Sequence, residues 1–342
     1  MEKIFSIFKS VFFIITEFII ITSIFKVTTN AAQPVKKNSD KNTTNSQTLS
    51  NKNEKPKVYM TKNISSEGLM SVYNALGRKP ASTNKVAVKI STGEPGNTHY
   101  LAPSLIKDIV QSVNGTIVEC NTAYGGGRAA TAMHYQVAKD HGFTAIAPVV
   151  IMDEKKEIDL PVINGKHLKI DRVGAHFPEY DFHVVLSHFK GHAMGGFGGA
   201  LKNMSIGYAS RSGKLNIHTS GESYTSWSGG DHDSFLESMA EAAKAIVDAA
   251  GKDKFVYVNV MNHLSVDCDC DGSPAAPTMA DIGILASLDP VALDKACVDL
   301  VYAAPDRKDL VERIESRNGI LTVNRAAEIG LGNLEYELIE ID

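Results

Sequence analysis

The sequence predicts an α/β fold with a mostly parallel sheet and flanking helices. Apolar runs rich in β-branched residues recur along the chain, and most are followed by a polar or glycine-rich loop and then by apolar residues at helical spacing. Strands that alternate with helices in this way are typical of parallel sheets. The chain has 342 residues, enough for one large domain or two ordinary ones. We expect a single α/β domain over residues 58–342.

The elements follow one another in a regular order. Strands are expected at 58–60, 86–90, 116–120, 145–152, 181–187, 255–261 and 282–286. Helices are expected at 66–76, at 103–113 and at 234–250, and another is expected to follow residue 128 and to end at residue 140. A further helix should begin after residue 288, because Asp289 is a good N-cap and Pro290 suits the first helical position.

The first 57 residues differ in amino-acid composition from the rest of the chain. Residues 1–31 combine a short basic start, an apolar stretch at 11–25 and small residues at 29–31, which is typical of a secretory signal peptide, with a membrane anchor as the alternative. Residues 32–57 are rich in Lys, Asn, Ser and Thr and predict a disordered tether. We therefore expect an exported or membrane-anchored protein, with a cytoplasmic location as the alternative.

The charge of the chain is unevenly spread. The formal net charge is −4, which divides into +5 for residues 1–57 and −9 for residues 58–342. Nucleic-acid binding needs a basic face to neutralise phosphates, so an acidic main body argues against that class of partner. Contact with a membrane is expected only through the N-terminal segment.

Reactive side chains fall in or just before loops that follow predicted strands. They are His99, Cys120, Arg128, His188, His192, His263, Cys268 and Cys270. In open parallel sheets, ligands bind beyond the carboxyl ends of the strands. If the sheet is parallel, these groups gather on one rim and form a site.

The segment 187–203 is the first informative stretch of this rim. It contains His188, Lys190 and His192 among many glycines, which weaken regular structure unless a close backbone approach requires them. Free backbone N–H groups followed by a lysine resemble an anion cradle. The expected binding residues for a small anionic ligand are Gly196, Gly198, Gly199, Lys202 and Asn203, together with Arg128 after a second glycine run. The alternative is a flexible loop with solvated charges.

Cys268 and Cys270 form the second informative stretch, with one aspartate between them. Soft thiolates near imidazoles suit zinc, copper or the iron of an iron–sulfur centre, with His188 or His192 as further ligands. The alternative is a local disulfide in an exported protein, or two ordinary thiols. Cys297 lies on an apolar helical face and is expected to be a buried core thiol. The role of Cys120 stays open.

Three motifs together resemble the family called domain of unknown function 362. They lie at 187–203, at 267–272 and at 281–294, and the resemblance extends over residues 58–342. It implies a relation to proteins often described as iron–sulfur centre proteins. Many members carry a ferredoxin-like insert after the segment that matches Lys214. Residues 215–230 contain no cysteine, so the chain resembles the subgroup without that insert.

Three functions follow as hypotheses. The leading one is a metal-binding protein of redox role, with an iron–sulfur cluster or zinc held by Cys268 and Cys270, an anionic ligand and a redox partner. The second is a metal-assisted enzyme acting on a small carboxylate or phosphorylated substrate, with Lys190 or His192 as general acid or base. The third is a non-catalytic anion-binding module in which the cysteines are structural.

Overall fold

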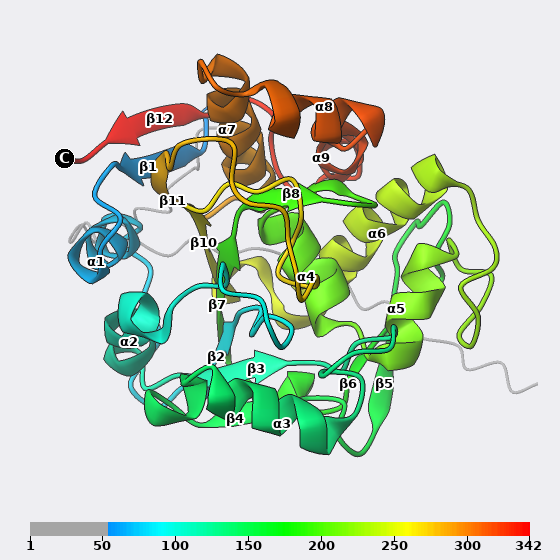
Figure 1. The fold of residues 1–342 in the computed structure, drawn as a ribbon. Coiled ribbons are helices and arrows are strands. Elements are labelled where there is room, and N and C mark those ends of the chain that lie inside the picture. The colour runs from blue at the N-terminus through cyan, green and yellow to red at the C-terminus, as the bar shows by residue number, and fades with distance from the viewer. Residues whose placement is uncertain (1–53) are drawn as a thin grey trace, which may run out of the picture. The chain divides into compact units, whose positions relative to one another are not determined.

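A computed structural model describes residues 54–342 of the protein (Figure 1). Eight strands form the main sheet: β1 Lys57–Thr61, β2 Val86–Lys89, β3 Thr116–Glu119, β4 Val149–Ile151, β7 Phe182–His188, β10 Phe255–Met261, β11 Gly283–Ser287 and β12 Glu337–Glu340. Two separate hairpins pair β5 Glu157–Pro161 with β6 Ile170–Gly174, and β8 Lys190–His192 with β9 Gly196–Gly198.

The sheet is mostly parallel, as predicted. Its order is β12-β1-β11-β10-β7-β2-β3-β4. The strands from β10 to β4 are all parallel neighbours, and β12 is parallel to β1. Only β11 runs antiparallel to its two neighbours, β1 and β10. The C-terminal strand β12 lies at the edge of the sheet beside β1 (Figure 1).

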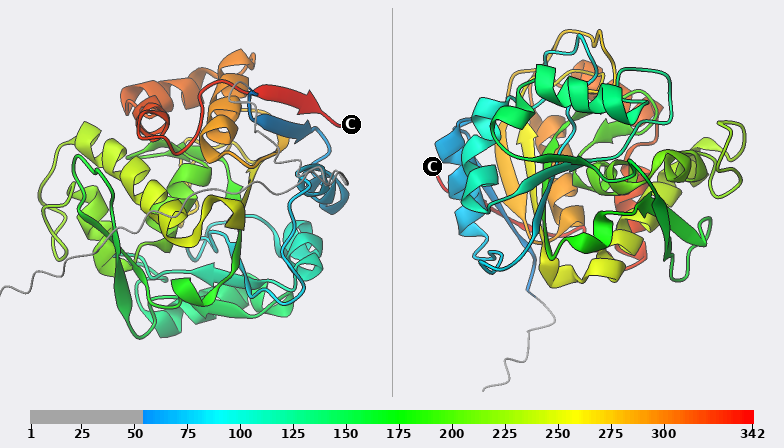
Figure 2. Two further views of the ribbon diagram at one scale, coloured as in Figure 1. Left: turned by 180° about the vertical axis from the view of Figure 1, so that it is seen from behind. Right: turned by 90° about the horizontal axis from the view of Figure 1, so that it is seen from below.

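Helices connect the strands and cover both faces of the sheet. They are α1 Ser66–Ala75, α2 Pro103–Ser112, α3 Thr131–Asp140, α4 Ala200–Tyr208, α5 Arg211–His218, α6 His232–Ala250, α7 Pro290–Ala303, α8 Lys308–Ser316 and α9 Ile320–Glu328. Helices α1 and α2 pack on one face, and α4, α6 and α7 pack on the other (Figure 2). The predicted start of α7 is confirmed, because the Asp289 carboxylate accepts hydrogen bonds from the backbone N–H groups of Val291 and Ala292.

The central strands are buried on both faces. In β7, Val184 and Leu186 belong to the core shared with α1 and α2, whereas Val185 between them belongs to the core on the opposite face. Successive strand side chains point to opposite faces, so a strand covered by helices on both sides reads as one continuous apolar run. This explains why the apolar runs at 181–187 and 255–261 could be recognised in the sequence.

The position of the site follows from the pairing of β7 with β10. These strands are parallel, with Val260 beside His188 near their carboxyl ends. The chain leaves β7 into the β8–β9 hairpin and α4, and it leaves β10 into the long loop that contains Cys268 and Cys270. Both informative stretches of the sequence therefore start from adjacent strand ends.

Several boundaries differ from the sequence-based expectations. The strand expected at 145–152 is confined to β4, because Phe143–Ala145 forms a turn of 3₁₀ helix. Lys57, assigned to the tether, already belongs to β1. The expected signal or anchor at 1–31 and the tether up to residue 53 lie outside the described residues. Within residues 54–342, which belong to one compact unit, no helix is long and apolar enough to cross a membrane.

Candidate functional site

A pocket of about 250 Å³ opens at the carboxyl ends of the parallel strands. Six of the eight reactive groups predicted for this rim line it: Cys120, Arg128, His188, His192, Cys268 and Cys270. The other two, His99 and His263, pack against each other with ring centroids 5.6 Å apart and do not line the pocket. The predicted gathering of these groups beyond the parallel strand ends is therefore seen for six of the eight.

Basic side chains dominate the charge of the pocket. Five basic and two acidic side chains line it: Lys89, Arg128, Lys190, Lys202, Lys214, Glu119 and Asp269. Both acidic groups are buried and already paired with basic ones. Sequence reasoning missed Lys89 and Glu119, which lie on predicted strands and gave no sign that their side chains reach a cavity. The excess of positive charge makes the pocket suitable for an anionic molecule.

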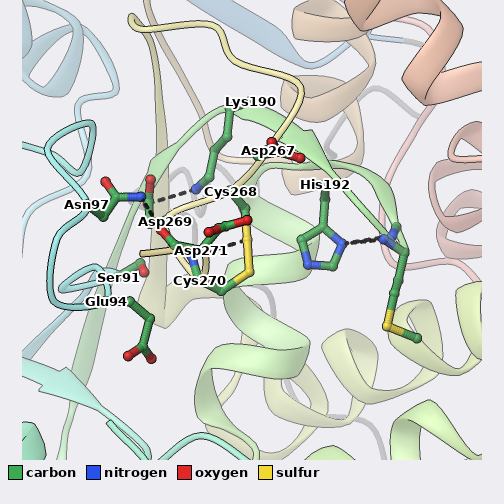
Figure 3. Close-up of a disulfide and its surroundings, with 12 residues drawn as sticks. Ser91, Glu94, Asn97, Lys190, His192, Asp267, Cys268, Asp269, Cys270 and Asp271 are labelled. Carbon is green, nitrogen blue, oxygen red and sulfur yellow. Dashed lines mark hydrogen bonds and ion pairs between the residues drawn. A yellow bond between two sulfur atoms is a disulfide. The ribbon is translucent and has the colours of Figure 1, made fainter. Parts of the chain in front are cut away.

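Asp269, between the two cysteines, holds the central ion-pair cluster (Figure 3). Its carboxylate lies 2.8 Å from His188 Nδ1 and 2.9 Å from Lys190 Nζ. Burial opposes ionisation of this carboxyl, but Lys190 and His188 outweigh burial and hold its pKa well below the usual range. Asp269 is the residue that sequence reasoning left without a role, although its place between two cysteines was visible.

His188 and Lys190 are committed to this cluster. His188 Nε2 lies 2.6 Å from the carbonyl oxygen of Asn262, while Nδ1 contacts the Asp269 carboxylate. Each ring nitrogen is thus occupied by a hydrogen-bond partner within the protein, and neither is open to a metal ion. The Lys190 amine also donates to the His188 carbonyl oxygen at 2.8 Å. His188 as a metal ligand and Lys190 as a general base are therefore disfavoured by this arrangement.

Cys268 and Cys270 form a disulfide at the wall of the pocket (Figure 3). This is one of the alternatives that the sequence left open. The two sulfur atoms and a ring nitrogen of His192 all lie within 4.8 Å of one another, so these three residues form a group that could hold a metal ion. A disulfide has no thiolate to offer, and the two sulfurs become metal ligands only after reduction.

His192 is neutral and lies beside the disulfide. Its Nδ1 accepts the backbone N–H groups of Gly195 at 2.8 Å and Met194 at 3.2 Å, so the proton of the neutral ring resides on Nε2. Burial, reinforced by the nearby Lys202, lowers the pKa of His192 well below its usual value. In Figure 3 one ring nitrogen of His192 carries a hydrogen bond, and the other faces the disulfide. A metal at Nε2 would have to displace that proton.

Lys202 lies in the first turn of α4 and points into the pocket. It is half-buried, and its amine has no hydrogen-bond partner among residues 54–342. Burial and, next, the Lys190 ammonium lower the pKa of Lys202 to about 7. Of the residues predicted to bind an anion, Lys202 is the one whose charged group is free to do so.

The expected anion cradle at the start of α4 is occupied by the protein itself. Backbone N–H groups of Ala200 and Leu201 donate to the Asp294 carboxylate at 2.8 and 2.9 Å. A Cβ on Gly199 would lie 2.3 Å from Asp294 Oδ1, so glycine is needed here for the carboxylate to approach. Gly198 and Gly199 line the pocket, whereas Gly196 packs against Gly319. The helix N-terminus therefore binds an internal carboxylate.

Arg128 and Asn203 also line the pocket, but their polar groups are already bonded. The Arg128 guanidinium donates to Glu94 at 2.9 Å and to Glu119 at 3.2 Å. The Asn203 amide nitrogen donates to the backbone oxygens of Lys89 and Leu186 at 3.1 and 3.2 Å, which ties α4 to two strands. Both residues support the walls of the pocket, and their predicted ligand binding gains no support from these contacts.

The remaining cysteines are separate from the disulfide. Cys120 and Cys297 are buried free thiols, and burial raises the pKa of both. The Cys120 sulfur contacts the carbonyl oxygen of Tyr208, and the Cys297 sulfur accepts from the Asn259 amide. The core role expected for Cys297 is confirmed. Neither cysteine belongs to the candidate metal group among the residues described.

Comparison with solved structures finds distant similarity. The lactate racemase apoprotein from Thermoanaerobacterium thermosaccharolyticum matches 59% of this chain and 50% of its own, with 17% identity and a TM-score of 0.37. A protein from Thermotoga maritima matches 77% of this chain and 58% of its own, with 11% identity and a TM-score of 0.40. The chain thus spans little more than half the length of these proteins.

Comparison of sequences gives a clearer result. No curated protein matches the chain. The three motifs at 187–203, 267–272 and 281–294 include the β8–β9 hairpin, the disulfide loop and the start of α7. Residues 86–299 match the family described as a domain of unknown function (DUF362), and the chain belongs to that family.

Proposed function

We propose that this protein binds a small carboxylate- or phosphate-bearing molecule in the pocket and acts in redox chemistry through Cys268 and Cys270, which hold a metal ion when reduced. The observation that carries the proposal is the convergence of both sulfurs and His192 within 4.8 Å, in a pocket where basic side chains outnumber acidic ones. An electron-transfer partner would set the state of the cysteine pair.

The surroundings of the cysteine pair support a reactive dithiol. The His192 Nε2 proton faces the disulfide, and a hydrogen bond to a thiolate favours the charged form. Lys190 and Lys202 line the same pocket and add positive charge, which also favours a thiolate. Both effects would favour the thiolate form of the reduced pair, which is the form that binds a metal ion.

The donor set favours a single soft ion over a four-cysteine cluster. Two thiolates suit zinc, copper(I) or iron. A cluster needs about four cysteine ligands, and Cys120 and Cys297 lie outside the candidate group in the part of the chain that is described. In the bound state Cys268 and Cys270 would hold the ion. The remaining positions would be filled by the anionic ligand, or by His192 Nε2 if the ring proton moved to Nδ1 and the hydrogen bonds from Gly195 and Met194 were given up.

A second function, a metal-assisted enzyme, is favoured by the state of His192. A neutral imidazole with its proton directed into a pocket can act as a general acid toward a bound substrate. Lys190, the other predicted catalytic group, is engaged by Asp269, so His192 is the better candidate. The ion would act as a Lewis acid in this reaction class.

Zinc binding should depend on the redox state of the protein. We expect the reduced protein to bind about one Zn²⁺ per chain in calorimetry, because two thiolates are free to coordinate it. The oxidised protein is the matched control, since it has the same chain with the thiolates blocked. Cys268→Ser should weaken binding by on the order of 100-fold or more.

The other outcomes discriminate between the hypotheses. Equal zinc affinity in both redox states would contradict the cysteine-based site. Iron and sulfide in protein purified without oxygen would replace the single ion with a cluster. An anion-binding module with structural cysteines predicts three results together. Cys268→Ser leaves the affinity for a small anion unchanged, Lys202→Ala abolishes that affinity, and neither redox state binds metal.

A further inference from the structure

The four lysines that line the pocket differ in how their amines are used. The Lys190 amine contacts Asp269 at 2.9 Å, and the Lys89 amine contacts Asn203 Oδ1 at 3.2 Å. The Lys214 amine donates to the backbone oxygen of Ala209. Of these four lysines, only Lys202 has an amine without a hydrogen-bond partner among residues 54–342. Its side chain is half-buried in the same pocket. An amine left free in such a place is available for chemistry on a bound molecule.

No acidic lining residue is free to neutralise Lys202. The Asp269 carboxylate is shared by His188 and Lys190, and Glu119 is shared by Lys89 and Arg128. Lys202 thus faces a positively charged pocket from a partly desolvated position, which disfavours its ammonium form. Its pKa of about 7 agrees with this geometry.

The neighbours of Lys202 suit attack on a carbonyl group. His192 keeps its Nε2 proton and lines the same pocket as Lys202. A neutral N–H donor of this kind can stabilise the oxygen of a carbonyl as negative charge develops on it. Lys190 and Lys214 provide positive charge for a second, anionic group of the same molecule.

We propose that Lys202 is a nucleophile that forms an imine with a small aldehyde or ketone bearing a carboxylate or phosphate group. The amine lone pair bonds to the carbonyl carbon, and the two amine protons pass to the carbonyl oxygen. The oxygen leaves as water, and a C=N bond remains. Nothing is oxidised or reduced. The proposal rests on the anionic pocket of the proposed function and names the substrate class of that pocket.

Reductive trapping tests the proposal directly. The full chain, in its disulfide form, is incubated with glyoxylate and cyanoborohydride at pH 7, and the modified lysines are mapped by peptide mass spectrometry. We expect Lys202 to be labelled at least about tenfold faster than Lys169, an exposed lysine outside the pocket. Lys202→Arg keeps a cation in the pocket and should lose this fast labelling while its thermal unfolding stays that of the wild type.

Labelling confined to exposed lysines, or labelling of Lys202 no faster than that of Lys169, would overturn the proposal. Glycolate, which has the same carboxylate but no carbonyl group, separates this failure from a failure of the proposed function. If glycolate binds and Lys202 is not trapped, the imine is wrong and the anionic pocket stands. If glycolate does not bind and nothing is trapped in the pocket, the anionic ligand is wrong as well.

Discussion

Replacing Asp269 with alanine should destabilise the fold by about 3–5 kcal/mol, because breaking a buried ion pair leaves its partners uncompensated. Asp269 is buried and contacts both His188 and Lys190, which are themselves buried. Without the carboxylate, the Lys190 ammonium would lose its counter-ion and His188 Nδ1 its partner, in a pocket that already has excess positive charge. Urea unfolding at pH 7 measures the effect.

Asp271→Ala is the matched control for this substitution. Asp271 lies in the same loop but is exposed, so its loss should change the free energy of unfolding by less than about 1 kcal/mol. A loss below about 1 kcal/mol for Asp269→Ala as well would show that the three side chains are not coupled.

The difference between the wild type and Asp269→Ala should depend on pH in a defined direction. The folded-state pKa of Asp269 is held well below its unfolded value of 3.8. The native state therefore binds fewer protons at this group than the unfolded state, and its contribution to stability is present in full above about pH 4. It is lost as the pH falls toward the lowered pKa. The two unfolding free energies should converge in acid.

The sequence predicted the fold where burial produced a regular pattern. Strands β7 and β10 are buried on both faces and appear as continuous apolar runs, and the long helix α6 shows the amphipathic spacing expected of it. The short hairpins were not predicted. Strand β8 contains only Lys190, Gly191 and His192, and three residues with two charged or polar side chains carry no periodicity. Tertiary packing decides the conformation of such segments.

Several residues of the pocket were predicted from the sequence, but their contacts were not. Cys268, Cys270, His192 and Lys202 do meet in one pocket, because they follow neighbouring strand ends. Which polar groups satisfy one another could not be predicted from spacing alone. Asp294 lies more than 90 positions from the N–H groups that it binds. A glycine that admits a ligand and a glycine that admits another part of the chain look the same in a sequence, so the cradle was assigned to an external anion.

Asp294→Ala should cost at least about 3 kcal/mol, because three buried donors lose their acceptor at once. The carboxylate binds the N–H groups of Ala200 and Leu201 and the Asn259 side-chain amide, at 2.7–2.9 Å. No water can replace it easily, since Asp294 is fully buried. Thermal and urea unfolding at pH 7 measure the loss. A change below about 1 kcal/mol would show that the start of α4 finds other acceptors.

Asp294→Asn separates shape from charge at the same position. It keeps one oxygen acceptor but presents an amide N–H₂ to the remaining donors, so we expect an intermediate loss at pH 7.

Burial raises the pKa of Asp294 to about 6, above its unfolded value of 3.8. A carboxyl of this kind contributes most to stability below about pH 4, and that contribution is lost as the pH rises through 6. The wild type should therefore lose stability relative to Asp294→Asn between about pH 4 and pH 6, opposite in sign to the effect of Asp269. An unchanged difference over that range would mean that Asp294 stays ionised and that the N–H groups of α4 outweigh its burial.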